Sequence, residues 1–240
     1  MDIKEFNEIF NKYLKDLNIK LDEEQIKKFY IYMNLLIDWN EKINLTSIIK
    51  PEEMILKHFI DCLTIAKYIE ENSELIDMGT GAGFPGIPLK IYRNDLKIVL
   101  ADSLNKRLNF LNEVIDTLKL DSIETIHTRA EELGKNKKYR EQFDIATSRA
   151  VANLATLSEY LLPFVKVGGK CICMKGPDID EEINIAKKAI ITLGGKVVKK
   201  DVFNLPQSDL GRSIVIIKKV KDTPGKFPRK PGTPAKEPIV

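Results

Sequence analysis

Three glycines that follow an aspartate at fixed spacing carry the clearest chemical signal in this sequence of 240 residues. The segment reads Asp77-Met78-Gly79-Thr80-Gly81-Ala82-Gly83-Phe84-Pro85 and comes directly after the apolar pair Leu75-Ile76. Alternating glycines at the end of a buried strand allow a tight turn whose backbone approaches a ligand closely, because no Cβ atoms intervene. The plainer alternative is that these glycines only shape a turn between a strand and a helix.

A carboxylate that follows the next apolar run supports the ligand interpretation. Asp102 comes directly after Lys97–Ala101, about where a side chain accepts hydrogen bonds from ribose hydroxyls in nucleotide-binding folds. Its simpler role would be to cap the helix that the sequence predicts from Leu104 onward. The glycine turn and this carboxylate together favour a cofactor that contains adenosine.

The details of the turn distinguish two adenosine cofactors. The dinucleotide fingerprint places its third glycine at the position of Phe84, and Pro85 stands where a pyrophosphate prefers free N–H groups. NAD therefore fits poorly. The pattern Gly79-x-Gly81-x-Gly83, with Asp77 two residues ahead, resembles the cofactor loop of class I S-adenosylmethionine (SAM) methyltransferases.

Two more segments follow predicted strands. Arg149 comes after the fourth strand, predicted at Phe143–Thr147, and should face the crevice at the carboxyl ends of the strands, where open α/β sheets bind ligands. An ordinary surface ion pair is the alternative for this arginine. Arg129-Ala130-Glu131 comes after the third strand and would lie beside an adenine ring, although this short segment is nearly uninformative alone.

The absence of two motifs argues against two classes of methyl acceptor. Methylation of an exocyclic amine usually goes with an Asn/Asp/Ser-Pro-Pro-aromatic element after the fourth strand, where this chain reads Ala146-Thr147-Ser148-Arg149. Methylation of cytosine C5 needs a cysteine nucleophile, typically after proline, but neither Cys171 nor Cys173 follows a proline, and both are expected in the core. The remaining class is an acceptor that is already nucleophilic at neutral pH, such as guanine N7. Because N7 carries a lone pair and no proton, its methylation needs positioning but no general base.

The elements that must hold these residues follow from the spacing of apolar side chains. Residues 1–70 carry apolar stripes at helical spacing, whereas residues 71–220 alternate short apolar runs with helical stretches. The last two runs, Lys196–Phe203 and Arg212–Val220, lack a helix between them. This pattern predicts an α/β fold with a mostly parallel sheet, an antiparallel final hairpin and a helical N-terminal region. The resemblance of the glycine turn to class I SAM-dependent methyltransferases implies their Rossmann-like fold with a seven-stranded sheet.

Residues 221–240 form a separate zone that is rich in proline and basic side chains. Five of the eleven prolines lie here, and five basic against two acidic side chains give this tail a charge of +3, equal to that of the whole chain. Prolines exclude helix and sheet pairing here, so we expect an extended tail, either docked on the surface or free. Lys226, Arg229 and Lys230 are candidates for contacts with RNA phosphates. The alternative is a structural strap, docked on the protein with Pro228 and Pro231 packed.

Composition excludes several classes of protein. A chain with 43% hydrophobic and 30% charged residues is typical of globular proteins and unlike disordered tails, collagen or coiled-coil rods. Three cysteines and two histidines offer no zinc spacing, so no metal is expected, and this cysteine usage fits a reducing cytosol. No apolar run approaches the roughly 20 residues of a membrane span. We expect a cytoplasmic monomer without a membrane partner.

Several motifs together resemble one methyltransferase family. They are Asp77–Pro88, Arg149-Ala150-Val151-Ala152, Met174-Lys175-Gly176 and Phe227–Pro234, besides His58-Phe59-Ile60-Asp61 in the helical N-terminus. They look like the ribosomal RNA small subunit methyltransferase G family, also called the glucose-inhibited division protein B family, and the resemblance covers almost the whole chain. It implies SAM-dependent N7 methylation of one guanine in bacterial 16S rRNA, either free or within an assembling or mature small ribosomal subunit.

The resemblance also implies a cofactor site without an obligatory catalytic side chain. With the glycine turn, the expected cofactor residues are Gly79, Gly81, Phe84, Asp102, Ser103, Leu104, Ala130, Glu131 and Arg149. His58 and Asp61 share a predicted helix face, where a catalytic role competes with a local hydrogen-bonded pair that supports the contact between the N-terminal helices and the sheet domain. A methyltransferase for a small molecule or another RNA site, and a non-enzymatic RNA-binding protein, stay open as alternatives.

Overall fold

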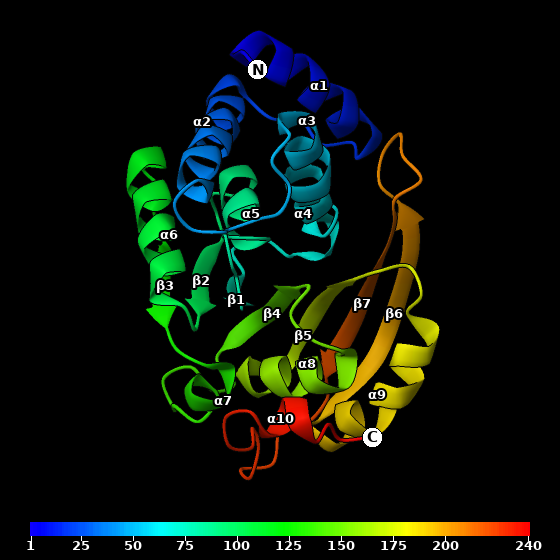
Figure 1. Cartoon of the computed structure of the whole chain (residues 1–240). Coiled ribbons are helices and arrows are strands. Elements are labelled where there is room, and N and C mark those ends of the chain that lie inside the picture. The colour runs from blue at the N-terminus through cyan, green and yellow to red at the C-terminus, as the bar shows by residue number, and fades with distance from the viewer.

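A computed structural model describes residues 1–240, and a single seven-stranded sheet forms its centre (Figure 1). The strands are β1 (Glu74–Met78), β2 (Lys97–Asp102), β3 (Ile123–His127), β4 (Phe143–Arg149), β5 (Val165–Lys175), β6 (Gly195–Asn204) and β7 (Gly211–Lys219). They lie in the order β3-β2-β1-β4-β5-β7-β6. The first five strands are parallel, and β7 is antiparallel to both β5 and β6. The predicted sheet and its final hairpin are confirmed.

Helices cover both faces of this sheet (Figure 1). The first seventy residues contain α1 (Ile3–Asp16), α2 (Glu23–Asn40), α3 (Pro51–Met54), the π-helix η1 (Ile55–Ile60), α4 (Asp61–Leu63) and the 3₁₀ turn η2 (Ala66–Tyr68). The later helical elements are α5 (Gly86–Tyr92), α6 (Asn105–Leu118), α7 (Ala130–Leu133), α8 (Leu154–Leu161), η3 (Leu162–Phe164), α9 (Asp180–Thr192) and α10 (Thr233–Lys236). The N-terminal helices, α5 and α6 lie on one face, and α7, α8 and α9 lie on the other.

Two hydrophobic cores correspond to these two faces. Alternate side chains of one strand enter different cores: Leu75 packs with the N-terminal helices, whereas its neighbour Ile76 packs with α8 and α9. The N-terminal core holds a group of edge-to-face and tilted aromatic rings, namely Phe6, Phe10, Phe29 and Phe59. The helical N-terminus is therefore one continuous layer with the sheet face that it covers.

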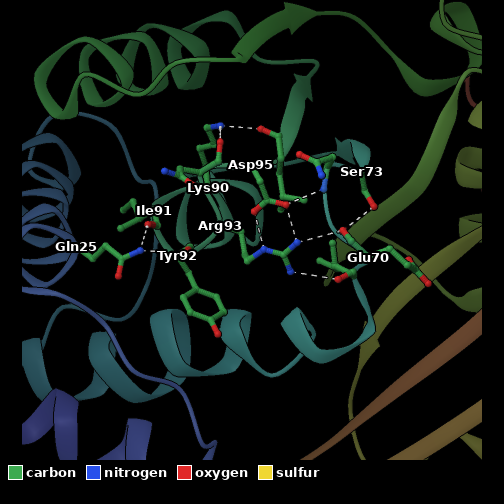
Figure 2. A network of polar contacts seen from close by, with 12 residues as sticks. Gln25, Glu70, Ser73, Lys90, Ile91, Tyr92, Arg93 and Asp95 are labelled. Carbon is green, nitrogen blue, oxygen red and sulfur yellow. Dashed lines mark hydrogen bonds and ion pairs between the residues drawn. The ribbon is translucent and has the colours of Figure 1, made fainter.

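A polar network fixes the C-terminal end of α5 (Figure 2). Gln25 belongs to a capping box with Asp22 at the start of α2, and its amide nitrogen also donates to the carbonyls of Ile91 and Tyr92 at 3.0 Å. The buried Lys90 ammonium donates to two backbone carbonyls at 2.7 Å. Because α5 is held at this end, the glycine turn at its opposite end has a fixed support.

The tail folds back along α7 and α8 (Figure 1). It contains one short helix, α10, so the expectation that its prolines exclude helix is wrong there. Pro234 lies in the first turn of α10, where the missing N–H has no intrahelical partner to lose. Phe227, Pro228 and Pro234 are buried, whereas Pro231 is exposed. None of the helices combines the length and apolarity that crossing a bilayer requires.

Candidate active site

The glycine turn joins the end of β1 to α5 at the carboxyl edge of the sheet. The amides of Gly79 and Thr80 both donate to the carbonyl of Ala101 on β2, at 2.8 and 3.2 Å. Gly81 and Gly83 have φ angles of +61° and +97°, which favour glycine. A Cβ atom at Gly83 would lie within 3.0 Å of three core side chains, whereas one at Gly81 would meet nothing within 4 Å. The Gly81 side of the turn therefore faces open space.

Asp77, near the end of β1, binds the turn through its side chain. Its buried carboxylate accepts hydrogen bonds from the Thr80 hydroxyl at 2.7 Å and from the Gly86 amide at 2.9 Å through the same oxygen, Oδ2. The other oxygen, Oδ1, is buried without a partner. Burial raises the pKa of Asp77 to about 7, against the effect of these hydrogen bonds. Asp77 therefore fixes the shape of the turn, and its ionisation above pH 7 places an unfavourable charge in the protein interior.

Asp102 connects the turn to the next strand. It ends β2, its side chain is only 2% exposed, and it accepts hydrogen bonds from the Gly81 and Leu104 amides at 2.9 Å. Arg107 from the first turn of α6 lies 3.3 Å from Oδ2. Asp102 is not the predicted N-cap of α6, because Leu104 occupies that position and no side chain caps the helix. The bond to Gly81 instead spans 21 residues of sequence and fixes the turn. Asp102 therefore joins the glycine turn to the loop that leads into α6.

Arg149, at the end of β4, lies between the turn and the N-terminal helices. Its guanidinium carbon lies 4.7 Å from the centroid of the Phe84 ring. The same ring also stacks on the His58 imidazole. Arg149 donates to the Lys57 carbonyl at 2.9 Å, to Nδ1 of His58 at 3.0 Å and to the Asp61 carboxylate at 3.2 Å. This arginine is a partly buried junction between β4 and η1, and not the surface ion pair considered as its alternative.

His58 and Asp61 both bind Arg149 instead of each other. A guanidinium only donates, so Nδ1 of His58 accepts and Nε2 carries the proton toward the Thr46 hydroxyl, 2.9 Å away. Burial and the charge of Arg149 lower the pKa of His58 to about 3, so the ring is neutral. Asp61 is 4% exposed and also pairs with Nε of Arg212 at 3.2 Å. The predicted local pair is replaced by a network centred on Arg149.

Three cavities lie in sequence along this edge of the sheet. The loop cavity, of about 440 Å³, is lined by the glycine turn, Asp102, Ser103, His58, Arg149 and neighbouring residues. The outer cavity, of about 380 Å³, shares His58, Arg149 and Ala150 with it and extends to Asp61, Lys175, Phe203 and Arg212. The strap cavity, of about 230 Å³, shares Gly79, Asp102, Ser103 and Val151 with the loop cavity and adds Ala130, Glu131, Tyr160 and Gly232.

The structure brings most of the expected cofactor residues together. Gly79, Gly81, Phe84, Asp102, Ser103 and Arg149 line the loop cavity, and Ala130 and Glu131 line the strap cavity. Leu104 lines neither; it occupies the N-cap position of α6, and its side chain is exposed. Sequence reasoning missed Arg212 and Gly232, because β7 and the tail reach this edge only through folding and no local motif marks them.

The basic tail residues lie in different environments. Arg229 forms an ion pair with Glu159 at 2.7 Å, and Glu159 is 1% exposed. These contacts fit the docked strap and not a phosphate contact, because binding phosphate would leave a buried carboxylate unpaired. Lys226 lies 5.3 Å from the Phe227 ring centroid, and both Lys226 and Lys230 are exposed. Among the three tail candidates, these two lysines are free to meet a partner.

The strand order, the glycine turn after β1 and the acidic residue at the end of β2 define a class I SAM-dependent methyltransferase fold. Solved structures with this fold include a SAM-dependent methyltransferase from Aquifex aeolicus (TM-score 0.52, 18% identity, 75% of this chain and 97% of that chain). Another is M. jannaschii TYW2 in complex with AdoMet (TM-score 0.52, 18% identity, 67% and 75% covered). At these identities the likeness concerns the fold alone.

The chain belongs to the GidB family, described as rRNA small subunit methyltransferase G, whose model matches residues 25–210. A relative named ribosomal RNA small subunit methyltransferase G from Clostridium novyi (strain NT) is 50% identical over 239 residues, covering 99% of this chain and 98% of the relative. One of the same name from Desulforamulus reducens is 55% identical over 228 residues, covering 94% and 95%. The predicted family is confirmed.

Proposed function

We propose that this protein transfers the methyl group of SAM to N7 of a guanine in bacterial 16S rRNA. The observation that carries the proposal is the junction of two cavities at His58, Arg149 and Ala150. A cofactor in the loop cavity and a base in the outer cavity would meet at this junction. Membership of a family named for ribosomal RNA methylation supports the choice of acceptor.

The loop cavity and the strap cavity fit SAM. The open space beside Gly81 leaves room for close approach to the backbone, and Asp102 at the shared border has acceptor capacity left for ribose hydroxyls. Ala130 and Glu131 lie at the far end, suited to adenine, and Phe84 and Arg149 lie at the near end. When bound, SAM would supply a methyl group on a positively charged sulfur. The N7 lone pair would bond to the methyl carbon while the carbon–sulfur bond breaks, so that S-adenosylhomocysteine leaves and no proton is transferred.

The outer cavity fits a purine base that is attached to an anionic backbone. Three cationic side chains line its walls, each within an ion pair with a carboxylate, and Phe203 provides an aromatic surface; the cations are Lys57, Lys175 and Arg212. An unstacked base in RNA is commonly held on an aromatic ring and by cationic side chains. His58 is neutral and both of its nitrogens have partners, so it offers no free general base. Guanine N7 requires none, because it carries no proton.

Methyl-labelled SAM tests this proposal with the purified protein. We expect label in 16S rRNA, supplied free or as small ribosomal subunits, and recovery of that label as 7-methylguanosine after digestion to nucleosides. Transfer only to small acceptors would support the small-molecule methyltransferase alternative. Binding of RNA without binding of SAM would support the non-enzymatic alternative. Comparison of free rRNA, assembling particles and mature subunits identifies the form of the substrate.

We further propose that the protein acts as a monomer in the cytoplasm. We divide the chain into three regions, namely the helical layer 1–70, the SAM-binding region 71–220 and the basic tail 221–240. The common core of the first two regions supports treating them as one folding unit. Sedimentation equilibrium should give a mass near 27.3 kDa, and a mass twice as large would contradict the monomer.

A further inference from the structure

The end of the chain is fastened to α8 by a buried ion pair and a hydrogen bond. We call residues 227–236 the C-terminal strap. Its Arg229 donates from the backbone amide to Glu159 at 2.7 Å and from the guanidinium to both carboxylate oxygens at 2.7 to 3.1 Å. The Thr156 hydroxyl donates to the carbonyl of Pro234 at 3.0 Å. These contacts hold the strap in one position on the protein.

Between these two fastenings, the strap meets a residue of the expected cofactor site. The amide of Gly232 donates to Oε1 of Glu131 at 2.8 Å, across 101 residues of sequence. Glu131 is 5% exposed, and its Oε2 accepts no hydrogen bond from the protein. Gly232 and Glu131 both line the strap cavity, which Gly79 and Asp102 line as well and share with the loop cavity. The chain terminus therefore supplies one wall of a cavity that begins at the glycine turn.

We propose that the C-terminal strap is part of the cofactor site, where the Gly232 amide positions Glu131 so that its free oxygen accepts a hydrogen bond from the 6-amino group of adenine. This inference rests on the proposed binding of SAM. A carboxylate held at one oxygen by a backbone amide keeps a fixed direction for the other oxygen. Gly232 acts as a positioning residue, since it orients Glu131 without needing to touch the cofactor.

The chemistry of a carboxylate makes this proposal specific. An ionised carboxylate only accepts hydrogen bonds, so it favours a purine with an amino group at C6 and disfavours one with an oxo group there. A strap that served only for stability would change the melting temperature but not this preference. The ratio of affinities for two ligands that differ at C6 therefore separates a positioning role from a structural one.

The test uses full-length chains and two ligands, S-adenosylhomocysteine and S-inosylhomocysteine, with dissociation constants measured by calorimetry. Gly232→Pro removes the amide donor and cannot adopt the φ of +84° found there. We expect it to weaken S-adenosylhomocysteine binding roughly ten- to a hundredfold, the effect of losing one charge-assisted hydrogen bond, and to change the inosine ligand less than threefold. Gly225→Ala is the matched control, because its added Cβ meets nothing within 4 Å and Gly225 lies outside the strap.

A second variant tests the proposal without changing the backbone of the strap. Glu131→Gln keeps an acceptor for Gly232 and adds an amino group that can donate to the 6-oxo group, so the preference should shift toward S-inosylhomocysteine. Equal losses for both ligands in Gly232→Pro, or an unchanged preference in Glu131→Gln, would overturn the positioning role. Failure of the unaltered protein to bind S-adenosylhomocysteine would instead overturn the proposed function.

Discussion

Arg149 donates a hydrogen bond to Nδ1 of His58 across 3.0 Å, joining the end of β4 to the π-helix η1. The bond fixes three properties of the site at once. It fixes the imidazole, which burial and the Arg149 charge keep neutral by lowering its pKa, it holds the guanidinium over the Phe84 ring, and it places both side chains on the border between the loop and outer cavities. His58 therefore supports Arg149 instead of exchanging protons.

The first prediction concerns the pH dependence of methyl transfer. The pKa of His58 lies near 3, so its charge does not change between pH 6 and pH 8.5. His58→Asn should therefore lower the rate through weaker support of Arg149 but keep the shape of the pH profile. Initial rates with labelled SAM across this range check the prediction. An inflection near pH 6.5 that is present in the parent and absent from the variant would contradict it.

The second prediction concerns stability and Asp77. Its pKa is about 7 in the folded protein, above the value of about 4 in an unfolded chain, so folding takes up a proton between these values. The free energy of unfolding should fall as pH rises from about 4 to about 7, by up to about 4 kcal/mol from this group. Asp77→Asn should remove that decline in urea titrations at several pH values.

Asp95 provides a matched control of opposite sign. The hydrogen bond from Arg93 lowers the pKa of Asp95 to about 2, so its contribution is present above pH 4 and is lost as pH falls toward 2. Asp95→Asn should leave the decline between pH 4 and pH 7 in place. If the free energy of unfolding of Asp77→Asn falls between pH 4 and pH 7 as much as that of the parent, ionisation of the buried Asp77 does not cause the fall.

The third prediction concerns the ribose end of the proposed cofactor site. Asp102→Ala should weaken SAM binding about ten- to a hundredfold, because hydrogen bonds to a charged group contribute roughly 1.5–3 kcal/mol, while unfolding stays cooperative. Asp116→Ala on the exposed side of α6 is the control and should bind SAM like the parent. An unchanged dissociation constant for Asp102→Ala in calorimetry would remove the ribose assignment.

The fourth prediction separates two glycines of the same turn. Gly81→Val adds a side chain to open space beside the turn, so it should abolish detectable methyl transfer by occupying the cofactor's volume, with a modest loss of stability from its φ of +61°. Gly83→Ala should mainly lower the melting temperature, because its Cβ would lie 2.6 Å from Ile87. Wild-type SAM affinity in Gly81→Val would show that this turn does not hold the cofactor.

The fifth prediction separates the basic residues of the tail. Changing both Lys226 and Lys230 to alanine should weaken rRNA binding and reduce its log–log salt slope by up to about 0.7–0.9 per lost phosphate contact, with SAM affinity unchanged. Arg229→Ala should instead lower stability by roughly 1.5–3 kcal/mol, since buried Glu159 loses its partner. An unaltered salt slope in the double lysine variant would exclude these contacts.

The sheet and the glycine turn were predictable because their signals are local. Asp77, the three glycines and Asp102 lie at the ends of two neighbouring strands, and the parallel arrangement of these strands follows from the helix between them. The hairpin of β6 and β7 was equally visible, since no helical stretch separates the two runs. Residues 233–236 were the exception, because a proline in the first turn is compatible with a short helix.

The partners of Arg149 could not be read from the sequence. Its contacts with His58 and Asp61 span 91 and 88 residues, and the contact of Asp61 with Arg212 spans 151. Helical spacing places His58 and Asp61 on one face but does not say what that face meets. The bond between Gly232 and Glu131 is of the same kind, because nothing in the composition of the tail indicates where it docks.

The most direct test of the central claim is the 7-methylguanosine content of 16S rRNA, measured by mass spectrometry of nucleosides from cells with and without this protein. We predict that one 7-methylguanosine per 16S rRNA is lost when the protein is absent. It should return when the unaltered chain is expressed and stay absent with the Gly81→Val chain at equal protein level. An unchanged 7-methylguanosine content in cells that lack the protein would contradict the account.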